Sequence, residues 1–104
     1  MRYVIPQLTD GIEADVGRIV FCLKGRDSGR YYVLVKKEGC FSYIANGKLR
    51  KLETPKRKNP IHLHITQLRV PDEYLANGSI VLTNREIKYL LKQADTLIAG
   101  VNDV

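Results

Sequence analysis

Cysteine is scarce in this sequence, which has only Cys22 and Cys40 among its 104 residues. Two thiols are too few for the disulfide framework of a small secreted domain, and both are expected to stay reduced in a cytosol. Long apolar runs are also absent, since none approaches the ~20 residues that a transmembrane helix needs. Residues 1–8 lack the charged region, apolar stretch and cleavage site of a signal peptide. We therefore expect a cytoplasmic protein that contacts no membrane.

Motifs of known catalytic sites are missing as well. The sequence has no nucleophile elbow, no phosphate-binding P-loop and no dinucleotide fingerprint. Its two histidines, His62 and His64, lie two residues apart with no acidic neighbour in sequence. Together with Cys22 and Cys40 they lack the paired ligand spacing of a zinc site. The sequence therefore predicts a non-catalytic protein with no metal, no cofactor and no small-molecule substrate.

Positive charge is plentiful but local. The formal net charge is +6 at pH 7, and residues 48–58, which we call the basic segment, hold six basic residues against the single acid Glu53. The rest of the chain is close to neutral, with 11 basic and 10 acidic residues. Such a patch concentrates positive potential where a polyanion could dock. Composition alone leaves nucleic acid, an anionic membrane face and an acidic protein open as partners.

Short β-prone segments separated by turns fill the first two thirds of the chain. They predict strands at residues 18–23, 31–36, 40–45, 48–52 and 61–66. Asn46-Gly47 predicts a type I′ turn that pairs the third strand with the fourth. In the fifth strand, alternation places Ile61, Leu63 and Ile65 inward and the two histidines outward.

The C-terminal third carries a helical pattern. Thr83 and Glu86 fit a capping box, and Ile87, Leu90, Leu91 and Ala94 then fall on one apolar face. These signals predict a helix over residues 84–97 with a frayed tail, preceded by a short helical turn within residues 72–77.

The predicted fold is mainly β, a small β-barrel of about five strands with a C-terminal α-helix. A barrel of this size is filled by its own side chains. The domain organisation expected is an N-terminal extension at residues 1–15, the barrel at 16–70 and a C-terminal segment at 71–104. Within the extension, the sequence indicates an edge strand at residues 2–5 and a turn or a single helical turn at residues 9–15.

Residues 24–30, which we call the glycine loop, are the first candidate binding site. Gly25 and Gly29 allow close backbone approach, and Lys24, Arg26 and Arg30 are suited to bind phosphates. The alternative is an ordinary hairpin loop in which the glycines serve the turn and charged side chains are solvated.

The basic segment is the second candidate. Clustered cations bind nucleic acid by releasing counterions from phosphates. Pro55 and Pro60 keep the chain extended beside them, and Asn46, Asn59 and His62 add hydrogen-bonding groups. The candidate contacts are Lys48, Arg50, Lys51, Lys56, Arg57, Lys58, Asn59 and His62. The alternative is a solvated run of charge.

Aromatic residues recur on successive predicted strands. Tyr31 and Tyr32 point to opposite faces, so at least one of them belongs in the core. Phe41 and Tyr43 follow on the next strand. An exposed ring could stack a base, but packing in the core is the favoured interpretation.

The stretch from residue 16 to residue 64 resembles a KOW-type domain. The matching residues are Gly17 to Val20, Gly25-Arg26-Asp27-Ser28-Gly29, Asn46 to Arg50, and Pro55 to Pro60 with His62. It is similar to bacterial RNA-binding proteins related to a group of archaeal and eukaryotic large-subunit ribosomal proteins.

This resemblance implies an SH3-like barrel that binds structured RNA, in particular large-subunit ribosomal RNA. It further implies contact through the loop between the first two strands, association with the ribosome or its assembly, and ribosomal proteins as neighbours. The alternative function is a protein-interaction module that contacts the transcription or translation machinery.

Overall fold

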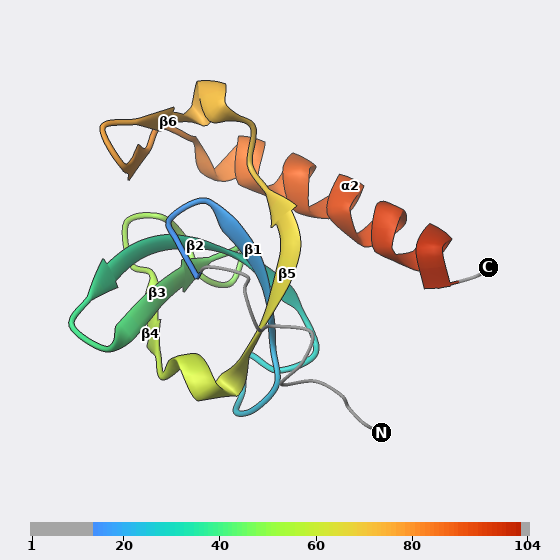
Figure 1. Ribbon diagram of the computed structural model, residues 1–104, viewed down its shortest axis with the longest axis horizontal. Coiled ribbons are helices and arrows are strands. Elements are labelled where there is room, and N and C mark those ends of the chain that lie inside the picture. The colour runs from blue at the N-terminus through green and yellow to red at the C-terminus, as the bar shows by residue number, and fades with distance from the viewer. Residues whose placement is uncertain (1–13, 103–104) are drawn as a thin grey trace.

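Five strands form one antiparallel sheet in the computed structural model, which describes residues 14–102. In chain order they are β1 (Arg18–Cys22), β2 (Tyr31–Glu38), β3 (Phe41–Ala45), β4 (Lys56–Lys58) and β5 (Leu63–Arg69). In space they follow the order β4-β3-β2-β1-β5, so that β4 and β5 are the two edges. The sheet is thus not closed into a barrel within the described residues. A mainly β fold with one C-terminal helix is confirmed (Figure 1).

A C-terminal segment follows β5 and lies against the sheet. It consists of the 3-10 turn η2 (Asp72–Tyr74), the strands β6 (Leu75–Ala76) and β7 (Ser79–Ile80), and the helix α2 (Asn84–Asn102). Another 3-10 turn, η1 (Pro60–His62), connects β4 to β5. In Figure 1, α2 and the β6–β7 hairpin lie on one side of the molecule, while η1 lies at the opposite end beside the β1–β2 turn. Within the described residues, no helix combines the length and apolar character needed to cross a bilayer.

Strand alternation gives the sheet two buried faces. Neighbouring residues Ile19 and Val20 on β1 point to opposite sides, and they are only 4% and 0% exposed. One core cluster consists of Val20, Cys22, Tyr32, Ile44, Leu63 and Ile65. The other joins Ile19, Val33 and Val70 to Ile87, Leu91 and Ala94 of α2. Full burial of an aliphatic side chain contributes roughly 1.5–3 kcal/mol, so α2 is an integral part of the core.

The start of α2 is the predicted capping box. Thr83 Oγ1 accepts from the backbone N–H of Glu86 at 3.2 Å, and Glu86 Oε1 accepts from the backbone N–H of Thr83 at 2.9 Å. The predicted end at residue 97 is wrong, since α2 continues to Asn102. No proline interrupts residues 98–102, and Gly100 costs only about 1 kcal/mol in a helix.

Several predicted strand limits need small corrections. β1 ends one residue earlier than expected, β2 extends two residues further, to Glu38, and β3 begins one residue later. The expected inward position of Ile61 is wrong, because this residue lies in η1 and its side chain is 76% exposed. Leu63 and Ile65 face inward as predicted. The strand expected at residues 2–5 and most of the turn expected at 9–15 lie outside the described residues.

The predicted hairpin at Asn46-Gly47 is wrong. Asn46 does not adopt the positive φ that a type I′ turn requires. Instead its side-chain Oδ1 accepts from the backbone N–H groups of Lys48 and Arg50, and its own N–H donates to the Arg50 carbonyl at 2.8 Å. These side-chain bonds close a loop over residues 46–50 in place of a strand. The fourth strand is β4, within the stretch that had been predicted to be an extended loop.

A type I′ turn is found instead at Asn77-Gly78. These residues have φ of 54° and 78°, and they connect β6 to β7 with Ala76 opposite Ser79. A short helical turn was predicted within residues 72–77. Only Asp72–Tyr74 is helical there, so that prediction is partly wrong.

The first residue of α2 anchors the basic segment. Asn84 Oδ1 accepts from the backbone N–H of Leu52 at 2.8 Å, and Asn84 Nδ2 donates to Glu53 Oε1 at 2.7 Å. Gly47 packs so closely against this residue that an added Cβ would overlap the Asn84 carbonyl oxygen. The start of α2 therefore fixes the position of the loop that connects β3 to β4.

We expect Gly47→Ala to destabilise the fold more than Gly78→Ala does. Both glycines have φ of 78°, so each alanine meets the same left-handed strain of about 1–2 kcal/mol. Only at Gly47 must the packed backbone also shift, for which we expect about 1–3 kcal/mol more. Urea unfolding at unchanged m-value measures the difference. Equal losses would contradict the close contact between this loop and α2.

Candidate nucleic-acid interface

Asp27 is the acidic residue at which the glycine loop and the basic segment meet. Its side chain is 5% exposed. Arg50 Nε donates to Asp27 Oδ1 at 2.8 Å, and Arg50 Nη2 donates to Oδ2 at 3.3 Å. Lys58 Nζ lies 3.5 Å from the same Oδ2. One carboxylate therefore holds two predicted RNA-binding cations and places the two candidate segments side by side.

Backbone hydrogen bonds shape the glycine loop around this carboxylate. The N–H of Gly29 donates to the Cys22 carbonyl at 2.9 Å, which brings the chain back toward β1. The N–H of Ser28 donates to the Gly25 carbonyl at 3.1 Å, and the Tyr32 hydroxyl donates to the Asp27 carbonyl at 3.0 Å. These bonds give the main chain at Asp27 a defined position.

Lys58 ties β4 to the glycine loop through a second contact. Its Nζ donates to the Lys24 carbonyl at 3.2 Å, and its side chain is only 11% exposed. Gly25 has φ of 88°, and a Cβ there would lie 2.9 Å from the same Nζ. A glycine at this position thus permits both the turn and the approach of the ammonium group.

The charges of this cluster stabilise one another. Burial disfavours the ionised carboxylate, but Arg50 and Lys58 more than offset this, so the pKa of Asp27 is held below its ordinary 3.8. The hydrogen bond that Arg50 donates to Asp27 likewise raises the pKa of Arg50. Burial first, and then the Asp27 charge, raise the pKa of Tyr32. Asp27 is therefore a carboxylate, and the cluster carries a net positive charge at neutral pH.

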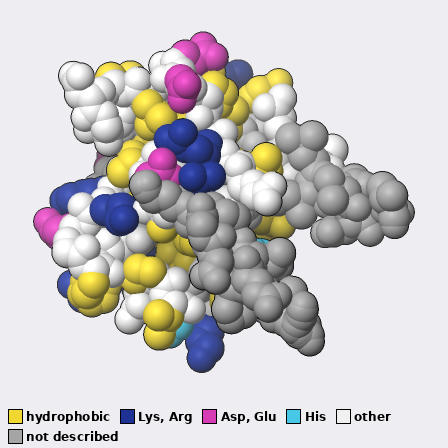
Figure 2. All heavy atoms as spheres, in the orientation of Figure 1, with side chains coloured by type: hydrophobic (Ala, Val, Ile, Leu, Met, Phe, Trp, Pro, Cys, Tyr) yellow, Lys and Arg dark blue, Asp and Glu magenta, His cyan; other side chains and the backbone are white. Residues whose placement is uncertain are grey.

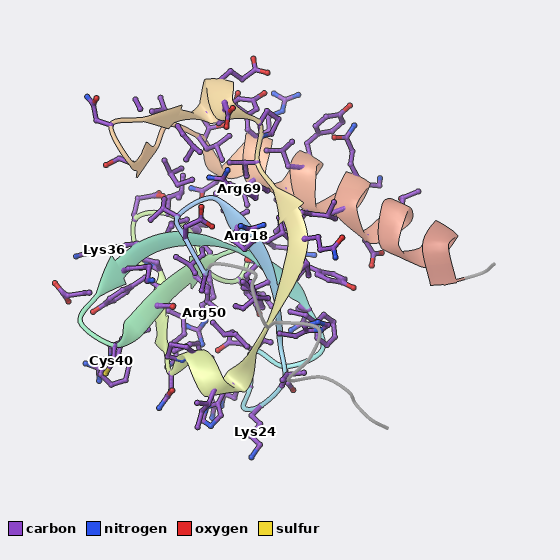
Figure 3. The ribbon with its side chains drawn as sticks, in the orientation of Figure 1. Arg18, Lys24, Lys36, Cys40, Arg50 and Arg69 are labelled. Atoms are coloured by element: carbon purple, nitrogen blue, oxygen red, sulfur yellow. The ribbon has the colours of Figure 1, made fainter. Side chains whose placement is uncertain are left out.

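The other predicted cations reach solvent. Lys24 and Arg26 of the glycine loop are exposed, as are Lys48, Lys51, Lys56 and Arg57 of the basic segment. In Figure 3, Lys24 projects away from the end of the molecule, whereas Arg50 lies between β4 and β5 in the same view. These exposed cations are accessible to a polyanion, whereas Arg50 and Lys58 form ion pairs with Asp27.

The remaining predicted site residues have local roles. Asn59 is exposed, and its Oδ1 caps η1 by accepting from the N–H of Ile61 at 3.1 Å. Arg30 is exposed, and its positive charge lowers the pKa of Tyr32 against the larger effect of burial. His62 is half-buried, and its carbonyl accepts from the N–H of Leu23 at 2.8 Å.

A second group of cations is paired with an acid of its own. Arg18 Nε lies 3.1 Å from Asp15 Oδ1, and Arg69 Nη2 lies 3.0 Å from Asp15 Oδ2. Figure 3 places both arginines near the upper part of β5, and Figure 2 shows Lys and Arg side chains gathered around an acidic one there. The charge of this group is therefore partly neutralised by Asp15.

Two aromatic rings are each contacted by a cationic side chain, and the sequence did not predict either contact. The guanidinium carbon of Arg57 lies 4.6 Å from the Phe41 ring centroid, and Lys36 Nζ lies 5.2 Å from that of Tyr43. Tyr32, in contrast, is fully buried, which confirms that one of the two adjacent tyrosines is in the core. The pairing of β4 with β3 places Arg57 opposite Tyr43 and so brings it close to the Phe41 ring. The sequence did not predict this pairing.

Cysteine and histidine do not assemble into a metal site in the part of the chain that the structure describes. Cys22 is buried, and its thiol lies 3.2 Å from the Lys24 carbonyl oxygen. Cys40 is exposed in the turn between β2 and β3. No three His, Cys, Asp or Glu side chains among residues 14–102 are arranged to hold a metal ion.

We expect Asp27→Asn to lower the free energy of unfolding by about 3 kcal/mol at neutral pH. The change leaves Arg50 and Lys58 without their buried counter-charge. As a control, Asp15→Asn removes more exposed ion pairs and should cost at most about 1 kcal/mol. Chemical denaturation of both variants measures the difference. Equal effects would show that burial does not strengthen the Asp27 pairs.

The pH dependence of stability gives a second measure of the same pairs. Because the folded-state pKa of Asp27 is depressed, its contribution is present above the unfolded value near 3.8 and is lost as the pH falls through the lower folded value. Wild type should therefore lose more stability on acidification than Asp27→Asn does. Parallel curves for the two proteins would contradict the assignment.

Comparisons with known protein families and curated proteins found no match.

Proposed function

We propose that this protein is a non-catalytic RNA-binding protein that binds ribosomal RNA and acts at the ribosome or in its assembly. The observation that carries the proposal is the Asp27 cluster, which holds the glycine loop and the basic segment side by side. Around the cluster, Lys24, Arg26, Lys51 and Lys56 reach solvent on segments whose backbone is fixed. Such an array of cations suits the phosphates of a folded RNA.

The topology supports a KOW-type, SH3-like barrel as the scaffold. The order β4-β3-β2-β1-β5, with a 3-10 turn before the last strand, agrees with this fold. Register shifts between Arg18 and Val20 and between Leu34 and Lys36 are points at which a sheet can bend toward closure. Val20, Tyr32 and Ile44 are 0% exposed, so the space between the strands is filled by side chains. Ligands are then bound on the outside.

Binding to ribosomal RNA uses an exposed, positively charged surface and needs no catalytic residue. Contacts to phosphates position an RNA but carry no base sequence, and A-form RNA is recognised by its shape and backbone. Two fixed segments separated by a defined distance suit such recognition. On this proposal the protein works in the cytoplasm, with ribosomal proteins as neighbours in the assembled particle.

We expect exposed cations of both segments to set the salt dependence of RNA binding. Lys24→Ala/Arg26→Ala and Lys51→Ala/Lys56→Ala should each reduce the slope of log affinity against log salt by roughly 1.4 to 1.8 on ribosomal RNA fragments. Arg50 and Lys58 are left intact because they hold Asp27. The control, Arg85→Ala/Lys92→Ala, removes two exposed charges from α2 and should leave the slope unchanged. Filter binding at several salt concentrations measures all three.

Fractionation of a lysate tests the ribosomal part of the proposal. At low salt the wild type should sediment with ribosomal particles, and the two site variants should shift toward the free fraction. A wild-type protein that stays wholly free would overturn the ribosomal assignment. Equal slopes for site and control variants would overturn the RNA-binding surface. RNase-insensitive association with RNA polymerase would favour a protein-interaction module instead.

A further inference from the structure

The outer face of β2, β3 and β4 carries an uncovered group of aromatic and cationic side chains. Tyr43 lies opposite Lys36 on β2 and opposite Arg57 on β4. Its neighbours along β3, Ser42 and Ile44, are 1% and 0% exposed and point into the protein. Alternation therefore directs Phe41 and Tyr43 to the outside, where both are half-buried. We call Lys36, Phe41, Tyr43 and Arg57 the aromatic-cation face.

The rings of this face are held in fixed positions. The guanidinium group of Arg57 covers Phe41, with 4.6 Å from its central carbon to the ring centroid. Tyr43 donates its hydroxyl hydrogen to Glu38 Oε1 at 3.0 Å, and Lys36 Nζ lies 3.6 Å from Glu38 Oε2. The exposed Arg57 thus presents a planar group that is supported from below by an aromatic ring.

A groove continues the aromatic-cation face toward the C-terminal segment. It has a volume of about 490 Å³ and is lined by Val35, Lys36, Leu52, Pro55, Ser79 and Ile80. Lys36 belongs to both features, since its ammonium group also lies 5.2 Å from the Tyr43 ring centroid. Pro55, which lines the groove, precedes Arg57 by two residues. The cations and the mostly apolar groove therefore form one continuous surface.

We propose that the aromatic-cation face and this groove bind unpaired nucleotides of an RNA. One base stacks on the Arg57 guanidinium above Phe41, and an adjacent base enters the groove beside Lys36. The inference rests on the proposed RNA-binding function and narrows its ligand to RNA with splayed single-stranded nucleotides, as in a loop or a bulge. Every base has a π-face that stacks on aromatic rings or arginine planes, whereas a duplex keeps its bases stacked internally.

The position of the face relative to the basic segment favours RNA over an acidic peptide. Arg57 lies in β4 between Lys56, which is exposed, and Lys58, which holds Asp27. Alternation directs Lys56 to the other side of this edge strand. An RNA chain that stacks a base on Arg57 and passes over the edge of the sheet therefore meets a cation for its phosphate at Lys56. An acidic peptide would use the charges but has no need of the supporting ring or of a planar group.

Two conservative variants separate stacking from charge. Arg57→Lys keeps the charge and removes the plane, and Phe41→Leu keeps an apolar side chain and removes the ring. Tyr89→Leu is the matched control, because Tyr89 is 63% exposed on α2, away from this face. The probes are a single-stranded RNA dodecamer that contains aminopurine and a blunt RNA duplex of the same sequence.

Both variants should weaken binding of the single strand by about 5- to 150-fold and leave binding of the duplex unchanged. They should also lose the quenching of aminopurine fluorescence that stacking produces. Tyr89→Leu should behave as wild type with both probes. Circular dichroism and the unfolding midpoint report whether each variant is folded.

Three outcomes would overturn this inference. Unchanged affinity of both variants for the single strand excludes stacking on the face. Equal losses on single strand and duplex show that the face contributes charge only, and tighter binding of an acidic peptide than of the single strand shows a protein-binding surface. If wild type binds neither RNA in a salt-dependent way, the proposed function fails first.

Discussion

The buried carboxylate of Asp27 is the constraint on which the binding surface depends. A carboxylate that is 5% exposed is costly unless opposite charges and hydrogen bonds replace its water. Arg50 and Lys58 provide them, and they come from the two ends of the basic segment. One arrangement of that segment is therefore far more favourable than others. The segment gains a defined position even though it is rich in charges that repel one another.

The helix supplies the second attachment of the same segment. Asn84 binds the main chain at Leu52 and the side chain at Glu53, between the points that Asp27 holds. Because α2 is itself fixed by Ile87, Leu91 and Ala94 in the core, this attachment is rigid. Cations on an ordered backbone lose less conformational entropy on binding than cations on a free loop. The C-terminal helix thus helps to position the proposed RNA-binding surface.

Local signals in the sequence predicted local structure well and distant contacts poorly. The capping box and the apolar face of α2 depend on residues a few positions apart, and both are correct. The hairpin at Asn46-Gly47 was wrong because the Asn46 side chain satisfies the backbone of residues 48 and 50. A count of charges also did not reveal the contact between Arg50 and Asp27. These two residues are 23 positions apart in sequence, and nothing local in the sequence connects them.

The six cations of the basic segment consequently have different functions. Arg50 and Lys58 neutralise Asp27, and Arg57 covers the Phe41 ring, so only Lys48, Lys51 and Lys56 are exposed without such a contact among the described residues. Counterion release scales with the number of phosphates that are neutralised. Because Asp27 neutralises part of this charge, the segment should contribute less salt dependence than its composition indicates. Lower dependence on charge leaves more of the binding free energy to shape and stacking, which is the part that can distinguish one RNA from another.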